Sequence, residues 1–267
     1  MIKKQTVSCN IDGLDVQVPA GTTILDAAKN IGVKIPTLCH HPYLSIEGAC
    51  RVCIVEVVGR QDFIASCSCP VEEGMKIITH NPKIRQARRD IVELILDNHP
   101  DECHTCERDH NCELQRLAYS MGVRHKHFQG EKKHYEKDFS SNSVIRDPNK
   151  CILCGRCVRI CKEIQGVSAI DMAHRGFQST VVPAYEQPFG ESVCSSCGQC
   201  INVCPTAAFL EKDYTNEVWE ALNDPTVTTV VQFAPSVRAA IGEGFGLPPG
   251  KNMEKQTITA LRRLGFD

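Results

Sequence analysis

Cysteine is the residue type with the clearest chemical meaning in this sequence, because 17 of its 267 residues are cysteines. Eight of them form two copies of one pattern: three cysteines two residues apart, with a fourth after three more residues. The copies run from Cys151 to Cys161 and from Cys194 to Cys204. Each iron of a cubane [4Fe–4S] cluster needs one further ligand, and three cysteines at this spacing can curl around one face of the cube. The repeat therefore predicts two [4Fe–4S] clusters.

The fourth cysteine of each copy is expected to bind the cluster of the other copy, because it lies on the following helix and points away from its own cluster. This crossing resembles the two-cluster bacterial ferredoxins, in which a proline follows the fourth cysteine. Pro205 keeps that proline, whereas Lys162 replaces it in the first copy. Zinc has no use for eight cysteines in this arrangement. The predicted ligand sets are Cys151, Cys154, Cys157 and Cys204 for one cluster, and Cys194, Cys197, Cys200 and Cys161 for the other.

A second group of cysteines lies nearer the N-terminus, at Cys39, Cys50, Cys53 and Cys67. Two irons bridged by two sulfides take two thiolates each, and a long loop with three of them can wrap such a [2Fe–2S] cluster. A zinc site is the weaker alternative, since its ligands usually come as two close pairs. The first gap, of ten residues, is longer than in plant-type ferredoxins. It resembles the [2Fe–2S] domain of the large iron–sulfur subunit of complex I and of [FeFe] hydrogenases. Cys69 competes with Cys67, which we favour because it matches that motif.

A histidine and three cysteines follow between these two groups. Their spacing resembles the [4Fe–4S] site with one histidine and three cysteines found in the same two families. A neutral imidazole in place of a thiolate should raise the reduction potential of the cluster and weaken its binding at low pH. His104 and His110 are local competitors that we expect to remain loop residues, and Cys9 and Cys69 are expected to be small buried hydrophobes. The ligands that the resemblance implies are His99, Cys103, Cys106 and Cys112.

The elements that must position these ligands follow from the apolar patterning. Strands at 7–11 and 14–18 flank Asp12-Gly13, a strong hairpin signal. A helix capped by Thr22 should run to Ile31, with strands at 53–58 and 75–79, which together give a β-grasp-like order. A helix begins at Asn81 with proline in its first position, and another covers 113–121. The buried stripe predicted for the longer helix consists of Ile84, Ala87, Ile91, Leu94 and Ile95.

The predicted class is α+β, with a truncated α/β domain at the C-terminal end. Three histidines at 125, 127 and 134 lie in a stretch rich in lysine and serine and have no recognisable ligand spacing. They are better explained as part of a solvated basic connector. The predicted domains are 1–80 (β-grasp [2Fe–2S]), 81–122 (helical, histidine-ligated [4Fe–4S]), 123–143 (linker), 144–210 (two-cluster ferredoxin) and 211–267 (incomplete catalytic domain).

The last of these segments contains no cysteine, and a strand at 227–233 and a helix at 253–264 are predicted in it. Its sequence resembles the opening of the catalytic domain of an [FeFe] hydrogenase. The resemblance implies that Ala234, Pro235 and Ser236 contact the catalytic cluster; the alternative is a plain buried strand end. The four further cysteines that this cluster needs are missing. We therefore expect the N-terminal part of a longer subunit, which should not evolve hydrogen by itself.

Composition narrows the class of protein. A net charge of −2 argues against nucleic-acid binding, and no apolar run is long enough to cross a membrane. The polar N-terminus lacks a secretory signal, so the reducing cytoplasm is expected, where disulfides are unlikely.

The predicted function is electron transfer, because each cluster would be fully ligated by protein and sulfide. The resemblance implies a multimeric, NAD(P)-linked hydrogenase, a group that includes electron-bifurcating enzymes. Its implied partners are an FMN- and NAD(P)-binding subunit similar to that of complex I, a small thioredoxin-like [2Fe–2S] subunit, and ferredoxin. The alternatives are a stand-alone relay subunit and the relay arm of an NAD-dependent formate dehydrogenase.

Overall fold

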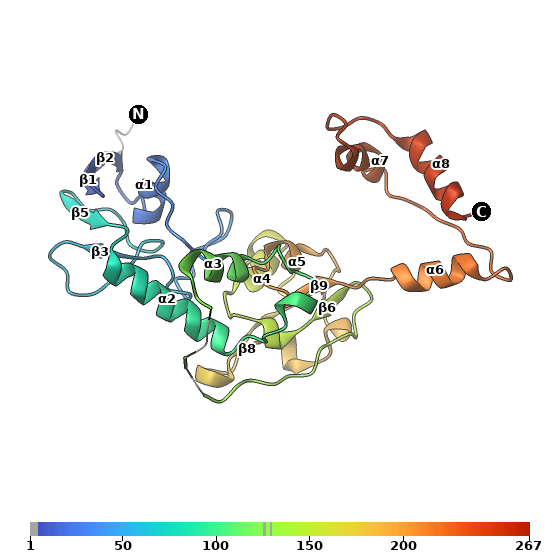
Figure 1. Ribbon diagram of the computed structural model, residues 1–267, viewed down its shortest axis with the longest axis horizontal. Helices are drawn as coiled ribbons and strands as arrows, with labels where there is room; N and C mark the ends of the chain where they lie inside the picture. The colour runs from blue at the N-terminus through green and yellow to red at the C-terminus, as the bar shows by residue number, and fades with distance from the viewer. Residues whose placement is uncertain (1–4, 125–126, 129) are drawn as a thin grey trace. The chain divides into compact units, whose positions relative to one another are not determined.

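The computed structural model describes residues 5–124, 127–128 and 130–267, and the chain divides into two compact units, Met1–Lys212 and Asp213–Asp267. The first unit begins with a five-stranded sheet in the order β2-β1-β5-β3-β4 (Figure 1). Only the β1–β5 pair is parallel. The strands are β1 (Thr6–Ile11), β2 (Leu14–Pro19), β3 (Ile54–Val57), β4 (Ile64–Ala65) and β5 (Met75–Ile78).

The predicted hairpin of β1 and β2 is confirmed, with Ile11 paired to Leu14. Helix α1 (Ile24–Asn30) follows it and packs its buried residues on the sheet. The predicted cap at Thr22 is wrong by one residue. The hydroxyl of Thr23 accepts from the backbone N–H of Asp26, whereas the hydroxyl of Thr22 donates to the carbonyl of Pro19. The cap is therefore the threonine whose oxygen faces the first helical turn.

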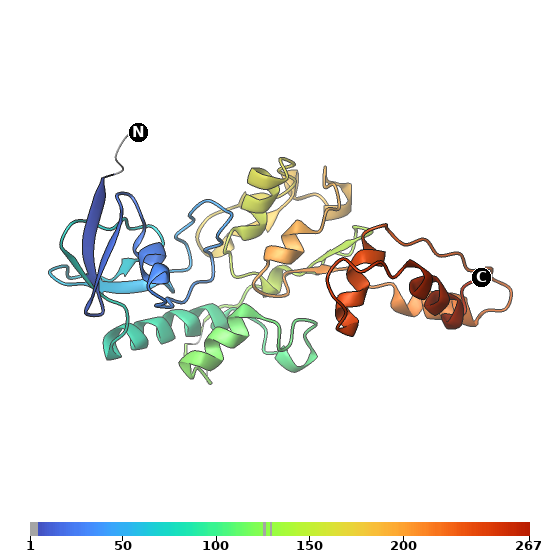
Figure 2. The same cartoon turned by 90° about the horizontal axis from the view of Figure 1, so that it is seen from above.

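Helix α2 (Pro82–Asp97), capped by Asn81 as predicted, lies along one side of the sheet, and α3 (Glu113–Met121) packs against α2 (Figure 2). The predicted buried stripe of α2 is rotated. Arg88, Val92 and Glu93 are buried beside Ile84, whereas Leu94 is 54% exposed. The reason is that Arg88 donates from Nη2 to the carbonyl of Ile54 at 2.6 Å, which pulls a charged residue into the core.

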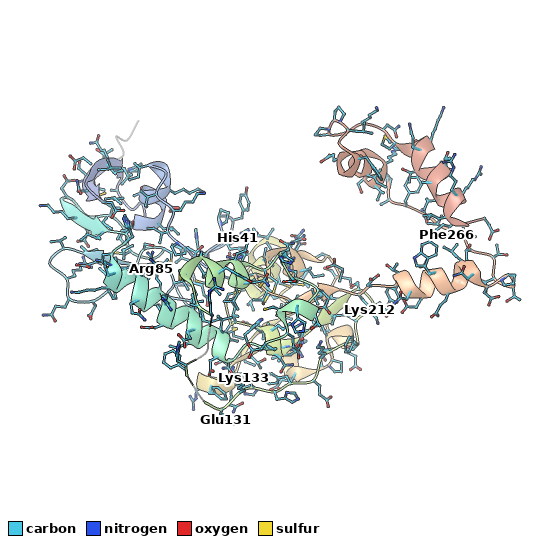
Figure 3. The ribbon with its side chains drawn as sticks, in the orientation of Figure 1. His41, Arg85, Glu131, Lys133, Lys212 and Phe266 are labelled. Atoms are coloured by element: carbon cyan, nitrogen blue, oxygen red, sulfur yellow. The ribbon has the colours of Figure 1, made fainter. Side chains whose placement is uncertain are left out.

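The predicted connector is tied to the protein at several points within its described residues. Lys133 lies beneath the C-terminal end of α2 (Figure 3), where its N–H donates to Asn98 Oδ1 at 3.2 Å. Its Nζ donates to the carbonyl of Ser179 at 2.7 Å, and Tyr135 is bound to Asn149. His134 belongs to this fixed stretch, and His127 contacts Glu93. His125 lies outside the described residues.

The cysteine repeat folds as a small domain whose core contains Phe189 and Phe209, with ring centroids 5.9 Å apart. Strands β6 and β9 pair antiparallel, as do β7 and β8. The strands are β6 (Val144–Arg146), β7 (Asp171–Ala173), β8 (Thr180–Val182) and β9 (Phe209–Glu211), and the helices are α4 (Arg156–Arg159), the π-turn η3 (Ile160–Ile164) and α5 (Gln199–Val203). Short 3-10 turns are η1 (Cys103–Thr105), η2 (Pro148–Lys150), η4 (Gly176–Gln178), η5 (Ala184–Glu186) and η6 (Phe189–Glu191).

The second unit is helical, with α6 (Thr215–Asn223), α7 (Val237–Ala240), η7 (Ile241–Phe245) and α8 (Glu254–Leu264). The predicted C-terminal helix is confirmed, but the strand predicted at 227–233 is wrong. All residues of this unit are described, and none of them forms a strand. Val230 is 85% exposed, so the apolar run has no neighbouring strand to pair with. Among the described residues of the whole chain, no helix combines the length and the apolar character that crossing a bilayer requires.

Candidate metal centres

The four N-terminal cysteines meet where the β-grasp sheet faces α2 and α3. Cys39 lies in the loop after α1, Cys50 and Cys53 precede β3, and Cys67 follows β4. Three of the four are at least 97% buried, and only Cys50 is partly exposed. The hydroxyl and N–H of Ser66 both bond the carbonyl of Cys53, which fixes the segments of Cys53 and Cys67 side by side.

These cysteines are arranged as two hydrogen-bonded pairs. The thiol of Cys39 lowers the pKa of Cys50 to about 6, and the thiol of Cys67 does the same for Cys53. The same hydrogen bonds raise the pKa of Cys39 and of Cys67. Two pairs of sulfurs suit two irons that take two thiolates each. Cys69 stands apart, half-buried, with Sγ on the carbonyl of Pro70, while Cys9 is buried in the core of the sheet.

The eight repeat cysteines surround two separate small cavities, each lined by four of them. Val181, Ala208 and Phe209 also line the first cavity, and Val144, Ile170 and Phe189 also line the second. The crossing predicted from the sequence places one cysteine of each repeat in the other repeat's cavity. The first cavity is lined by Cys151, Cys154, Cys157 and Cys204, and the second by Cys161, Cys194, Cys197 and Cys200.

The two repeats have the same local backbone. Leu153 and Ser196, each between the first two cysteines of its copy, have φ angles of 54° and 55°. Their N–H groups donate to Cys151 Sγ and Cys194 Sγ, both at 3.4 Å. This left-handed residue turns the chain so that an amide points at the cysteine sulfur, a contact that stabilises negative charge on the sulfur.

The burial of these sulfurs favours a bound metal centre over free thiolates. Burial raises the pKa of Cys151 to about 11 and that of Cys154 to about 12, so thiolates here need the positive charge of a metal. Four sulfurs around each cavity match the four protein ligands that a [4Fe–4S] cluster takes.

A third small cavity brings together the remaining predicted ligands. This cavity, at the end of α2, is lined by His99, Cys103, Cys106 and Cys112. Lys150 also lines it, and its Nζ lies 3.6 Å from Cys106 Sγ and 3.5 Å from Glu107. Burial lowers the pKa of Lys150, but attraction to the Cys106 thiolate and the Glu107 carboxylate is stronger, so the net effect is a raised pKa. A buried cation therefore lies beside this site.

The cavity lined by Cys154 and Cys204 adjoins the other sites. Arg108 donates from Nη2 to the carbonyl of Cys204 at 2.7 Å, and Cys112 Sγ lies 3.5 Å from the carbonyl of Pro205. On another side, Arg159 donates from Nη2 to the carbonyls of Cys39 at 2.7 Å and Cys154 at 3.1 Å. This site therefore lies between the N-terminal cysteines and the histidine site.

Sequence reasoning missed these cations. Lys150 directly precedes Cys151, and Arg159 lies between Cys157 and Cys161. The available signal for a functional role was the presence of charged residues within or next to a ligand motif. Their roles, however, depend on contacts with residues of other domains.

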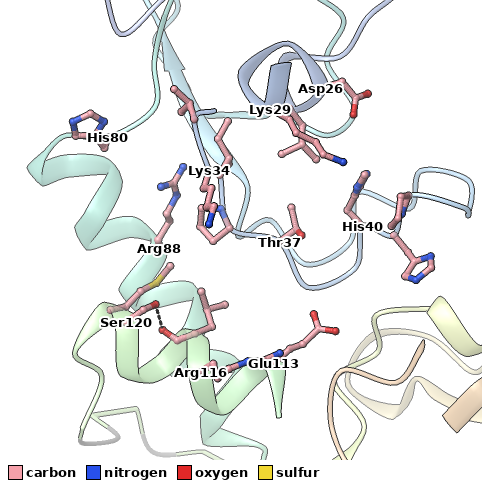
Figure 4. A pocket seen from close by; sticks show the side chains of 18 of the residues that line it. Asp26, Lys29, Lys34, Thr37, His40, His80, Arg88, Glu113, Arg116 and Ser120 are labelled. Carbon is pink, nitrogen blue, oxygen red and sulfur yellow. Dashed lines mark hydrogen bonds between the residues drawn. The ribbon is translucent and has the colours of Figure 1, made fainter. Parts of the chain in front are cut away.

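A wide cleft of about 1620 Å³ opens beside the N-terminal cysteines (Figure 4). Lys29 and Lys34 come from one wall, and Arg85 and Arg116 from the two helices opposite. Three histidines also line it, His40, His41 and His80, and burial lowers the pKa of the first two. The cleft is therefore basic through its lysines and arginines. The remaining predicted residues, Ala234, Pro235 and Ser236, lie in an exposed segment that leads into α7 in the second unit.

Comparison with known families matches four models along the chain. They are a 2Fe-2S iron-sulfur cluster binding domain (residues 4–82), the NADH-ubiquinone oxidoreductase-G iron-sulfur binding region (88–127), the ferredoxin-like domain of NADH-quinone oxidoreductase subunit 3 (141–210) and the C-terminal domain of the iron only hydrogenase large subunit (227–267).

Individual relatives agree with these matches. The NADP-reducing hydrogenase subunit HndD of Solidesulfovibrio fructosivorans is 44% identical over 98% of this chain and 46% of its own length. The NADPH-Fe(3+) oxidoreductase subunit alpha of Geobacter sulfurreducens is 36% identical over 83% of this chain and 26% of its own. The chain thus spans less than half the length of these two relatives. A chain in the crystal structure of an NAD+-reducing [NiFe]-hydrogenase in the H2-reduced state matches with a TM-score of 0.72 and 31% identity, over 77% of this chain and 87% of that one.

Proposed function

Because this chain belongs to the family of iron–sulfur subunits of NAD(P)-linked hydrogenases and NADH-quinone oxidoreductases, we propose that it is the electron-relay portion of an [FeFe] hydrogenase subunit. The observation that carries this proposal is the set of three cavities, each lined by the four side chains that the sequence assigns to one [4Fe–4S] cluster. The match to the iron only hydrogenase model over 227–267 favours a hydrogenase over other users of the same relay.

The proposed cofactors are one [2Fe–2S] and three [4Fe–4S] clusters, which supply reversible one-electron storage. In the [2Fe–2S] site, Cys39 and Cys50 would hold one iron, and Cys53 and Cys67 the other. Their pairing by hydrogen bonds supports this assignment. His99, with its three cysteines, would hold the cluster at the end of α2.

The contacts between sites support a branched relay. Arg159 would hold the [2Fe–2S] site beside the site of Cys154 and Cys204, and Arg108 would hold the site of His99 beside it from another side. The clusters, when bound, would supply electron transfer between these neighbouring sites. The protein's own part is to hold the ligands rigidly, to exclude water from their sulfurs and to place cations beside them.

The proposed partners are an FMN- and NAD(P)-binding subunit and a small thioredoxin-like [2Fe–2S] subunit. The basic cleft suits an acidic electron carrier, for which ferredoxin is the candidate. Lys29→Glu and Lys34→Glu should then slow reduction of the clusters by reduced ferredoxin and flatten its salt dependence. Lys76→Glu, exposed on β5 outside the cleft, is the control. Equal rates in all three variants would place the partner elsewhere.

A site that converts hydrogen would lie beyond this set of cysteines, and Ala234, Pro235 and Ser236 are proposed to contact its cluster. Their exposure in the second unit is compatible with contact to such a group.

The experiment that tests the relay is anaerobic purification followed by iron, sulfide and zinc analysis and EPR. We expect iron and sulfide in equal amounts, one [2Fe–2S] signal and three [4Fe–4S] signals. Colourless protein with zinc on its cysteines would contradict the proposal.

A further inference from the structure

The ten-residue gap between Cys39 and Cys50 forms a loop that docks on the first cysteine repeat. The N–H of Ser45 donates to the carboxylate of Glu163 at 2.9 Å, and its hydroxyl donates to the same group. Glu47 pairs with Nε of Arg159 at 3.2 Å. The loop therefore joins the N-terminal domain to α4 and η3 of the ferredoxin domain.

This docking uses a position where the two repeats differ, the residue that follows the fourth cysteine. After Cys204, Pro205 ends the helix, since proline cannot continue it. After Cys161 stands Lys162, and the chain continues through the π-turn η3. That extra turn carries Glu163 to the loop. The missing proline thus has a structural consequence beyond the motif itself.

Arg159 lies at the centre of this junction. Its side chain is only 6% exposed. Nη1 donates to the carbonyl of Ser45, while Nη2 donates both to Cys39 and to Cys154. One guanidinium therefore bonds the backbone of a ligand from each of two sites. A lysine could not make this planar fork of contacts.

We propose that Arg159 is a positioning residue for electron transfer between the [2Fe–2S] site and the cluster of Cys154. It fixes the separation of the two clusters, and its permanent positive charge favours the reduced, more negative form of each. The inference rests on the proposed cluster assignment. It predicts a role for a residue that contacts the ligands through their carbonyls and not through their sulfurs.

The test uses the anaerobically purified chain with Arg159→Gln and Arg159→Lys. Arg60→Gln is the matched control, because Arg60 lies on the N-terminal domain that carries the [2Fe–2S] cysteines but forms only an exposed pair with Glu72. The readouts are iron and sulfide content, the potential of each cluster by redox-titrated EPR, and the spin–spin broadening between the two reduced clusters.

We expect Arg159→Gln to lower the ratio of reduced to oxidised [2Fe–2S] cluster about tenfold at a fixed solution potential. For one electron, this change corresponds to a shift of about 59 mV in the reduction potential. Arg159→Lys, which keeps the charge, should shift this ratio less. Both variants should lose or change the spin–spin broadening, and Arg60→Gln should match the wild type.

Two results would overturn the inference. One is full cluster content with wild-type potentials and line shapes in both Arg159 variants. The other is loss of the [2Fe–2S] signal alone in both, because Arg159 would then retain the cluster rather than space it. Absence of iron–sulfur signals from the wild-type chain would instead refute the proposed function.

Discussion

Lys150 offers the sharpest test of the electrostatics around the proposed histidine-ligated site. Its Nζ lies 3.6 Å from Cys106 Sγ, and its side chain is only 5% exposed. Replacing it by methionine keeps much of its shape and removes the charge. An electron added to the cluster is shared by its irons and sulfides. Its mean distance from Lys150 Nζ is therefore somewhat larger than the distance from Nζ to Cys106 Sγ.

The magnitude follows from Coulomb's law. At a separation of about 6 Å and an effective dielectric constant of about 20, two unit charges interact by about 2.8 kcal/mol. That energy corresponds to about 120 mV for one electron. Because the cation stabilises the reduced cluster, Lys150→Met should lower the potential of this one cluster by roughly that amount, and leave the [2Fe–2S] potential almost unchanged.

The assay is redox-titrated EPR on cluster-loaded protein, with Lys137→Met as the control. Lys137 contacts the same acid as Lys150, Asp147, at 3.4 Å, but is 43% exposed. Water therefore screens its charge, and its removal should produce a much smaller shift. A Lys150→Met potential equal to that of the wild type, with iron content unchanged, would refute the reasoning.

Three further outcomes follow from the geometry. His99→Cys should lower the potential of one [4Fe–4S] signal in redox-titrated EPR, because a thiolate replaces a neutral imidazole; an unchanged potential would exclude ligation by that histidine. Gly155→Ala should lower the thermal unfolding midpoint more than Gly198→Ala. Both glycines have a positive φ, but only at Gly155 would the new methyl group lie 3.2 Å from a carboxylate of the docked loop; equal midpoints would mean that the loop is not docked. Cys67→Ser should abolish the [2Fe–2S] EPR signal and Cys69→Ser should retain it, and the reverse result would exchange their roles.

Much of the first unit could be predicted because local signals and tertiary packing agree. Asp12-Gly13 gave the hairpin, since φ angles of 50° and 89° suit that pair. Asn81 and Pro82 gave the start of α2 because both act within the first turn. The grouping of the repeat cysteines around two cavities could also be predicted, because three members of each group are close neighbours in the chain.

The failures have a common physical cause, which is dependence on distant partners. Burial of Arg88 requires a carbonyl supplied by β3, which no pattern within α2 reveals. The apolar run at 227–233 has the composition of a strand, but a strand needs a neighbour and this unit supplies none. The roles of Lys150 and Arg159 likewise depend on groups from other domains.

Helix α2 has a consequence for how this protein can vary. One of its residues, Arg88, is bonded next to Cys53, and its C-terminal end leads directly into His99. Its 16 residues make a rod of about 24 Å at 1.5 Å per residue. Inserting a single residue would lengthen that rod and turn everything beyond it by about 100°. Substitutions on the surface of α2 are therefore tolerable. A mutation that changes its length, in contrast, would displace the proposed cluster site that follows it.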